Sequence, residues 1–345
     1  CLVRRRQPVR LRYERGLTMK AIVQDKFGPP QDVLRLKEID EPEVGDDEAL
    51  VRVHATSVHI GDYYGIAGLP YVMRPLFAPL RAKNGVPGTD IAGTVEAVGR
   101  EATKFQPGDV VFGSYKGAFA QYASFPEDAL ALKPENLTSE QASAVGVSAL
   151  TALQALRTQG KLQEGQQVLI TGASGGVGTF AVQIAKSLGA EVTGVCSTRN
   201  ADMVRSLGAD HIVDYTQEDF TEGDQRYDLI LDNTGTRSLS ITRRALKPTG
   251  ILVANGAPVG GWFGGLTRPI ASFAVSLVVK QQAKPFVSTT KPEDLATLKE
   301  LIEAGELVPV VDRTYSLSEA PEAVAHVGEG HAQGKTIIAV EEGAG

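Results

Sequence analysis

The sequence predicts an α/β chain in which a barrel-like, β-rich domain is interrupted by a doubly wound domain built on a parallel sheet. Short alternating strands separated by Gly and Pro occupy the first third of the chain, as is typical of compact β domains. A strand, a glycine-rich turn and a helix then begin a regular βα alternation, which predicts the parallel sheet. Strand-like runs return near the C-terminus. We therefore expect one domain at 19–145 and 286–345, with the other inserted at 146–285.

The β-rich part is predicted from its apolar alternation. Its strand-like segments are 20–24, 34–36, 49–55, 93–99 and 109–112, with 308–311 and 336–340 near the C-terminus. Residues 137–160 have a helical pattern, with Thr138 at the N-cap and Glu140 and Gln141 in the first turn. This helical segment leads into the inserted domain.

The glycine-rich turn predicts a nucleotide site. The apolar run 168–170 has the pattern of a buried strand, and apolar residues of the following helix recur at the i, i+3, i+4 and i+7 positions of one face. Between them lie Gly172, Gly175, Gly176 and Gly178, with Ala173 in the first position of the usual three-glycine spacing. Such a turn lets backbone amides approach a pyrophosphate at the positive end of the helix.

The end of the next strand predicts which dinucleotide binds. Roughly 20 residues past the glycines an NAD site would place Asp or Glu, whereas this chain has Ser-Thr-Arg-Asn at 197–200. The Ser197 hydroxyl and the Arg199 guanidinium suit a 2′-phosphate, so we expect NADPH rather than NADH. The alternative interpretation is an ordinary α/β turn with a solvated arginine.

The βα alternation continues to about residue 285. Helices are expected at 201–207, closed by Gly208, and at 239–246, with strands at 212–213, 227–232 and 250–254. A further helix at 292–304 follows. Ligand atoms should meet the carboxyl ends of the strands, which are 171–173, 197–199, 232–235 and 255–256.

Composition restricts the class of protein. With 345 residues, 42% of them hydrophobic, the chain can bury one or two cores, and its formal charge of -6 argues against a nucleic-acid partner. Its two cysteines cannot form a disulfide framework or a four-thiolate zinc site, and Cys196 suits packing in a buried strand. The longest apolar run, 270–279, is shorter than the ~20 residues that span a bilayer. We expect a soluble, cytoplasmic protein with no membrane span.

Residues 1–18 are expected to lie outside the fold as a disordered extension. They carry six arginines against the single acid Glu14. An organelle-targeting peptide is Arg-rich in the same way, but Pro8 would interrupt its amphipathic helix.

These residues resemble the medium-chain dehydrogenase/reductase superfamily over 19–345, and within it the zinc-free quinone oxidoreductase (zeta-crystallin-like) branch. The run 165–186, GQQVLITGASGGVGTFAVQIAK, matches the signature of that branch throughout, and 105–113 and the closing 334–338 are further landmarks. The resemblance implies a GroES-like catalytic domain and a Rossmann nucleotide-binding domain, and a homodimer through the latter is possible. Zinc-dependent relatives have Gly-His-Glu where this chain has Gly-Thr-Asp at 88–90, so we expect no metal site.

The resemblance also implies the site residues. His59 stands where the branch commonly has Asn, Tyr64 matches an aromatic that faces the nicotinamide, and Asp62 matches an acidic position; His59 and Tyr64 are the expected catalytic residues. Tyr63 and Tyr64 are also interpretable as core aromatics. The residues expected to bind the coenzyme are Thr151, Ala173, Gly175, Gly176, Val177, Ser197, Arg199, Asn200, Tyr215, Asn233, Asn255 and Lys335.

Without a metal to polarise an alcohol, the reaction favoured is hydride addition from NADPH to an activated C=C or a quinone, which needs hydrogen-bond donors near the substrate oxygen and a proton source. The apolar segments 69–80 and 262–263 would line a site for a small hydrophobic carbonyl or quinone. Two alternatives stay open: a dinucleotide-binding protein with little turnover, and a zinc-type alcohol dehydrogenase.

Overall fold

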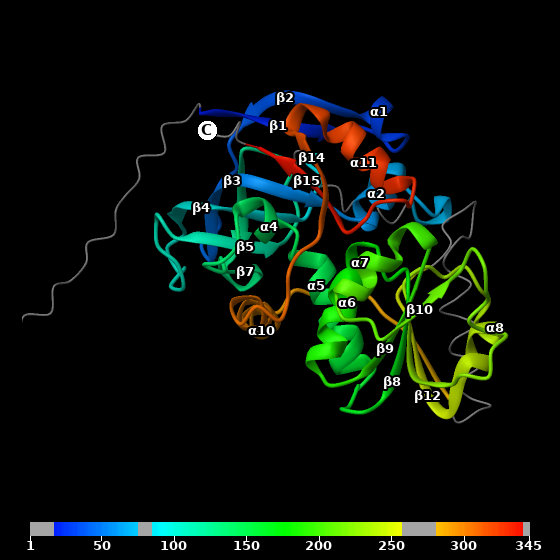
Figure 1. Cartoon of the computed structure of the whole chain (residues 1–345). Coiled ribbons are helices and arrows are strands. Elements are labelled where there is room, and N and C mark those ends of the chain that lie inside the picture. The colour runs from blue at the N-terminus through cyan, green and yellow to red at the C-terminus, as the bar shows by residue number, and fades with distance from the viewer. Residues whose placement is uncertain (1–16, 75–84, 257–280, 341–345) are drawn as a thin grey trace, which may run out of the picture.

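The computed structural model describes residues 17–74, 85–256 and 281–340 (Figure 1). Of the expected extension at 1–18, all but the last two residues lie outside these ranges, and Thr18 already begins the first strand. The expected substrate-lining residues 75–80 and 262–263, and the apolar run 270–279, also lie outside the described residues.

A mixed seven-stranded sheet forms the centre of the first body. Its order is β14-β15-β3-β4-β5-β7, and β6 also pairs with β3. The strands are β3 (Glu48–Val58), β4 (Asp90–Val98), β5 (Val110–Ser114), β6 (Tyr122–Pro126), β7 (Leu130–Leu132), β14 (Val311–Ser316) and β15 (Lys335–Ala339). A separate antiparallel pair, β1 (Thr18–Gln24) and β2 (Leu34–Asp40), lies beside it. Because β15 pairs with β3, the C-terminal segment returns to the body that the N-terminal segment forms.

The second body is a six-stranded parallel sheet of order β10-β9-β8-β11-β12-β13. In chain order this is the 3-2-1-4-5-6 arrangement of a doubly wound fold, whose order reverses between β8 and β11. The strands are β8 (Gln167–Thr171), β9 (Glu191–Cys196), β10 (His211–Asp214), β11 (Tyr227–Asp232), β12 (Leu246–Ala254) and β13 (Gln282–Pro285).

Helices cover both faces of the parallel sheet, and each face has its own apolar core. Val168 and Ile170 of β8 point into a large core shared with α5, α6, α7 and α10, whereas Leu169 points to the opposite face, toward α8. The described helices are α1 (Pro30–Val33), α2 (Ile60–Ala67), α4 (Ser139–Ser143), α5 (Gly146–Leu153), α6 (Gly176–Ser187), α7 (Ala201–Ser206), α8 (Leu239–Thr242), α10 (Pro292–Glu303) and α11 (Ala320–Gly328). Figure 1 shows α5 and α6 between the two bodies.

Two chain segments cross between the bodies and are bonded to each other. The helix α5 continues as a π-helical turn (Gln154–Gln159). The Gln154 side chain donates to the Thr289 carbonyl (2.7 Å) and accepts from the Thr289 amide (3.2 Å). It also donates to Asp294 (2.7 Å) in the first turn of α10. Asp294 accepts a second hydrogen bond from Arg157. The outgoing and returning segments are therefore fixed side by side.

The structure differs from the sequence prediction in several details. The expected helix 239–246 ends at Thr242, a 3-10 turn follows at 243–245, and Leu246 already begins β12. The expected strand 308–311 is wrong, because the strand begins at Val311 and runs to Ser316; this edge strand is mostly solvent-accessible, so it has no apolar alternation to mark it. The short strands β6, β7 and β13 were not predicted. Helix 137–160 is divided at residues 144–145. Helix α2, which carries Tyr63 and Tyr64, was not predicted.

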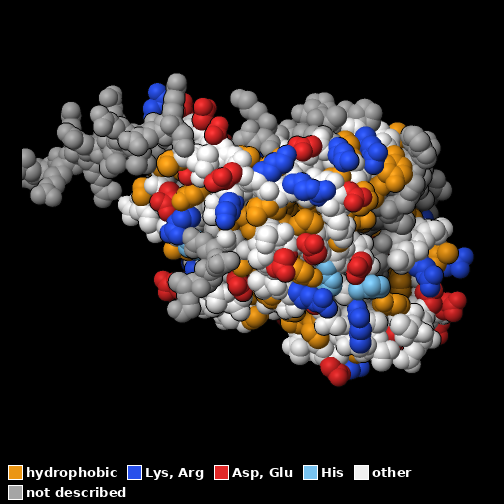
Figure 2. All heavy atoms as spheres, turned by 90° about the horizontal axis from the view of Figure 1, so that it is seen from above, with side chains coloured by type: hydrophobic (Ala, Val, Ile, Leu, Met, Phe, Trp, Pro, Cys, Tyr) orange, Lys and Arg blue, Asp and Glu red, His pale blue; other side chains and the backbone are white. Residues whose placement is uncertain are grey.

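Acidic, basic and apolar side chains are interspersed over the face that Figure 2 shows, without a broad area of one charge. Among the described helices, none is long and apolar enough to cross a membrane.

Candidate coenzyme and active site

The glycine-rich loop joins β8 to the N-terminus of α6 at the reversal of strand order. Gly172 turns the chain with φ of 62°, and Gly175 is the N-cap of α6, so no side chain caps this helix. The first amides of a helix have no intrahelical acceptor, and a twelve-residue helix presents the positive end of its dipole there. The amides of Gly176 and Val177 thus suit a pyrophosphate.

Gly175 and Gly178, which occupy the second and third positions of the usual three-glycine spacing, have different surroundings. A Cβ at Gly175 would meet only the Gly172 oxygen, at 3.4 Å. A Cβ at Gly178 would lie 2.0 Å from that oxygen and 2.7 Å from the backbone of Ala173. Packing therefore requires glycine at 178, whereas position 175 borders open space that a ligand can fill. Ala173 is buried beneath the loop.

The expected adenosine end lies after β9. Ser197 begins a short 3-10 turn, Thr198–Asn200, and Arg199 donates from Nη2 to the His331 carbonyl at 3.0 Å. This bond uses one of the five guanidinium donors, which leaves the others for a phosphate. Tyr215, after β10, is exposed.

Asp214 is a carboxylate at this end that the sequence analysis missed. Thr198 and Thr216 donate to it, and these hydrogen bonds lower the pKa of Asp214 to about 2. Asp214 ends β10, whereas a ribose-binding acid is expected at the end of β9. Its bond to Thr198 holds the turn that carries Arg199.

The C-terminal segment is clasped to the glycine loop. Asn200 donates to Ser174 Oγ (2.8 Å) and accepts from Gln333 Nε2 (2.7 Å), and the Gly334 amide donates to the Ser174 carbonyl (2.9 Å). We call these four residues, Ser174, Asn200, Gln333 and Gly334, the interdomain clasp. Asn200 was expected to bind the coenzyme, but its side chain is buried in this clasp.

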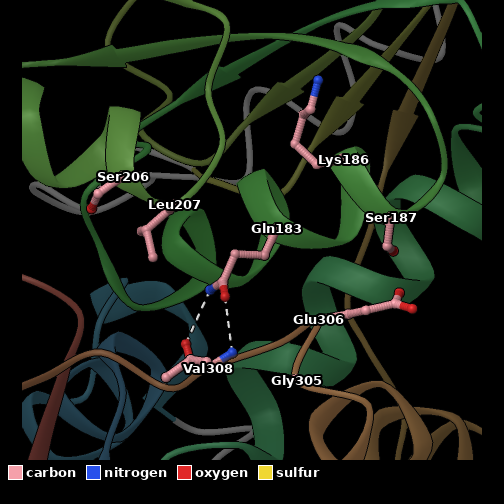
Figure 3. Close-up of a pocket in the computed structure, with 8 residues that line it drawn as sticks. All are labelled: Gln183, Lys186, Ser187, Ser206, Leu207, Gly305, Glu306 and Val308. Atoms are coloured by element: carbon pink, nitrogen blue, oxygen red, sulfur yellow. Dashed lines mark hydrogen bonds between the residues drawn. The ribbon is translucent and has the colours of Figure 1, made fainter.

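A second contact holds the segment around Val308 against the C-terminal half of α6. In a surface cleft of about 660 Å³, the Gln183 side chain donates to the Val308 carbonyl and accepts from the Val308 amide (Figure 3). Two residues further on, the Val310 carbonyl accepts from the amide of Lys335 at 2.8 Å. The segment that supports the clasp is thus itself held on α6.

Lys335, expected at the coenzyme, is buried beside the glycine loop. Its Nζ donates to Ser148 Oγ (3.1 Å) and lies 3.5 Å from Asp90 Oδ2, and both charged side chains are fully buried. Its stem is against Gly176, where a Cβ would be 3.2 Å from Lys335 Cδ. Asp90 also accepts from Ser57 Oγ and the Val147 amide. The sequence analysis did not find this ion pair.

The remaining expected coenzyme residues lie at strand ends and on α5. Asn233, after β11, donates to the Thr171 carbonyl (3.0 Å), and Asn255, after β12, donates to Asn233 Oδ1 (2.9 Å). Thr151 is buried on α5, with its hydroxyl 2.7 Å from that of Ser288. Asn233 and Asn255 are therefore brought together with the glycine loop at one edge of the sheet.

The expected catalytic residues surround the start of α2. His59 is the N-cap: its Nδ1 accepts from the Gly61 amide (2.9 Å), its backbone amide donates to Asp62 (2.9 Å), and its Nε2 lies 2.7 Å from Thr89 Oγ1. Burial raises the pKa of Asp62, and the adjacent His59 opposes that rise. Tyr64 is half-buried one turn along α2, and burial raises the pKa of its hydroxyl above the ordinary value of 10.0.

Comparison with known proteins identifies the family. A model of the alcohol dehydrogenase GroES-like domain matches residues 45–135, and a model described as zinc-binding dehydrogenase matches residues 207–338. The mitochondrial NAD(P)H oxidoreductase RTN4IP1 of Mus musculus is 33% identical over 94% of this chain and 90% of its own length. The chloroplastic quinone-oxidoreductase QR1 of Triphysaria versicolor is 31% identical over 94% and 99%. The quinone oxidoreductase from Coxiella burnetii superposes with a TM-score of 0.83 at 30% identity, over 94% of this chain and all of that one.

The chain belongs to the zinc-free quinone oxidoreductase branch of the medium-chain dehydrogenase/reductase superfamily. The expected fold class is thereby confirmed, with a GroES-like domain and a Rossmann-like parallel sheet.

One of the two matching family models is described as a zinc-binding dehydrogenase. Within residues 17–74, 85–256 and 281–340, no three His, Cys, Asp or Glu side chains come close enough to hold a metal ion. The position that carries His in the zinc-dependent relatives is Thr89, and its hydroxyl bonds His59.

Proposed function

We propose that the protein is an NADPH-dependent reductase that adds hydride to the activated C=C of a hydrophobic enone or enal, or to a quinone, without a metal. The observation that carries the proposal is the uncapped α6 N-terminus at the glycine loop, facing the same edge of the sheet as Arg199. A dinucleotide fits there because position 175 borders open space. When bound, a reduced nicotinamide supplies the hydride.

The choice of NADPH rests on hydrogen-bond donors. Among the described residues Arg199 bonds only the His331 carbonyl, which leaves guanidinium donors for a 2′-phosphate beside Ser197. The oxygens of the nearby Asp214 already accept from Thr198, Thr216 and Gln217. The mitochondrial relative of Mus musculus is named an NAD(P)H oxidoreductase, a name that does not separate the two coenzymes.

The substrate class rests on donors rather than on metal ligands. Hydrogen-bond donors that face the substrate oxygen stabilise the negative charge that develops there, and the hydroxyls of Thr89 and Tyr64 lie around α2. Tyr64 is protonated at neutral pH, since burial raises its pKa, and it is the candidate proton source. A relative named 2-methylene-furan-3-one reductase, from Solanum lycopersicum, is 29% identical over 89% of this chain.

A panel of electrophiles tests the proposal. Purified protein is mixed with NADPH or NADH and with 9,10-phenanthrenequinone, an alkenal, an enone or a simple ketone, and coenzyme oxidation is followed at 340 nm. We expect turnover of the first three with NADPH. Tight NADPH binding without oxidation by any of them would instead indicate a dinucleotide-binding protein.

We also propose a homodimer through the nucleotide domain and a cytoplasmic location. Strand β13 is an edge of the parallel sheet among the described residues, and an edge strand can pair with that of a second copy. Light scattering during size-exclusion chromatography tests the dimer. Since relatives are named mitochondrial or chloroplastic, cell fractionation tests the location.

A further inference from the structure

The hydrogen bonds around His59 determine where its proton lies. A backbone N–H can only donate, so the Gly61 amide 2.9 Å from Nδ1 requires a lone pair on that nitrogen. The ring hydrogen is therefore on Nε2, which donates to Thr89 Oγ1 at 2.7 Å. His59 is thus held in one orientation by the Gly61 amide on Nδ1 and by Thr89 on Nε2, with the Asp62 carboxylate 3.4 Å from the same Nε2.

Thr89 consequently has its own hydrogen to give. A hydroxyl that accepts from His59 still carries one O–H donor, and no second partner for Thr89 Oγ1 exists among the described residues. Thr89 is only partly buried, so this hydrogen is available to a ligand. A hydroxyl that accepts a hydrogen bond also becomes a better donor.

The backbone around Thr89 is fixed on both sides. Gly88 has φ of 90°, and a Cβ there would lie 2.2 Å from the Phe119 ring. Asp90 is fully buried, with bonds from Ser57 and the Val147 amide. A rigid support of this kind is what a pre-organised donor requires.

Thr89 also lies where the two domains meet. Its neighbour Asp90 contacts Lys335, which bonds Ser148 on α5 and packs against Gly176 of the glycine loop. On the other side His59 begins α2, which carries Tyr64. Thr89 is thus linked through Asp90 and Lys335 to the coenzyme loop, and through His59 to the helix that carries Tyr64.

We propose that the Thr89 hydroxyl donates a hydrogen bond to the carbonyl oxygen of the substrate, and that His59 is a positioning residue that orients this hydroxyl. The inference rests on the proposed reductase function. Hydride addition forms a C–H bond at the β-carbon, and the π electrons of the C=C bond move toward the carbonyl oxygen. Thr89 stabilises that enolate oxygen, and a proton from Tyr64 or water then forms the C–H bond at the α-carbon.

The test compares Thr89→Val, which keeps the shape and removes the hydroxyl, with Thr89→Ser, which keeps the hydroxyl. Loss of one such donor typically lowers kcat by about 10²-fold or more. We expect that loss with an enone for Thr89→Val, near wild-type kcat for Thr89→Ser, and unchanged NADPH Kd and Tm for both. Full enone turnover by Thr89→Val would overturn the inference. Should Thr89→Val be destabilised, Thr89→Ala is measured in its place against the same serine control.

Two further readouts separate His59 as a positioning residue from His59 as the acid. In histidine-¹⁵N NMR of the coenzyme-free protein, His59 should show an unprotonated Nδ1 and a protonated Nε2; the opposite tautomer would contradict the inference. The pH profile of kcat for an enone should have the same shape in the wild type and in His59→Asn, whereas a fall of kcat with rising pH that His59→Asn abolishes would make His59 the proton donor. A wild type that binds NADPH but oxidises it with no enone, alkenal or quinone would overturn the proposed function itself, independently of any Thr89 variant.

Discussion

Gly175 and Gly178 lie in the same loop, but Gly175 borders open space and Gly178 is packed against the backbone. Gly175→Val should leave a folded protein that no longer binds NADPH or NADH, because its side chain enters the space that the pyrophosphate needs. Gly178→Ala should lower Tm instead, because its Cβ would lie 2.0 Å from the Gly172 oxygen. Fluorescence titration and thermal melts measure the two effects. Wild-type saturation of Gly175→Val with NADPH would make the loop a structural turn only.

Arg199 is the residue that should separate NADPH from NADH. Arg199→Ala removes a charged donor from the expected 2′-phosphate site, a loss of ~1.5–3 kcal/mol, or about 10- to 100-fold in Kd. NADH, which has no 2′-phosphate, should bind nearly as before. Calorimetric titration with both coenzymes checks this, and an equal loss for both would assign Arg199 to its bond with the His331 carbonyl.

Tyr64 should matter for enones more than for quinones. Tyr64→Phe removes the proposed proton source, whose contribution is typically 10²–10⁴-fold, so kcat for an enone should fall while NADPH affinity and Tm stay the same. Water can protonate the more stable hydroquinone anion, so quinone turnover should fall less. Parallel steady-state kinetics with both substrates are the measurement, and undiminished enone turnover would remove Tyr64 from the mechanism.

At the scale of single residues, the place of a residue in the strand–turn–helix unit was easier to predict than the residues to which it is hydrogen-bonded. The glycines, Ser197 and Arg199 are local signals, since the strand–turn–helix pattern fixes where they lie. The partners of Asn200 and Lys335 are distant in the chain: Asn200 bonds Gln333, and Lys335 bonds Ser148. Only the fold joins segments separated by more than a hundred residues, so neither contact could be predicted from the sequence.

At the scale of elements, the interdomain clasp should set the affinity for both coenzymes equally. Gln333→Ala removes the donor to Asn200 and loosens the C-terminal segment over the loop. NADPH and NADH affinities should fall by the same factor, in contrast to Arg199→Ala, and Gln333→Glu tests whether an acceptor can replace the amide. The Kd values for both coenzymes check this. A loss confined to NADPH would place Gln333 at the phosphate instead.

Elements with strong apolar periodicity were predicted, and those with little were not. β8 and α6 are buried along a full face, so their spacing is explicit in the sequence. β14 and β13 are edge strands, partly polar and short, and β13 ends in Pro285, which an edge position tolerates. The α2 helix begins with an unusual histidine N-cap, for which no sequence signal of the Ser, Thr, Asp or Asn kind exists.

At the scale of the whole molecule, two sheets bring their functional edges together. The C-terminal segment crosses from α10 to β14 and β15, so Lys335 and Gly334 of one body reach the glycine loop of the other. The reaction proposed here depends on that meeting, because the hydride donor would be held by one body and the substrate oxygen by the other. The parallel sheet was predicted from the βα alternation and the return of the chain from the strand-like runs near the C-terminus, whereas the strand order and the junction between the bodies were not predicted.

The most direct test of the metal-free reductase is turnover after removal of metal. The protein is dialysed against a strong chelator, its zinc content is measured, and NADPH oxidation is followed with an enone or 9,10-phenanthrenequinone while the product is quantified. We expect the rate to be retained at negligible zinc, with one NADPH oxidised for each substrate reduced. Loss of activity that zinc specifically restores would contradict the proposal.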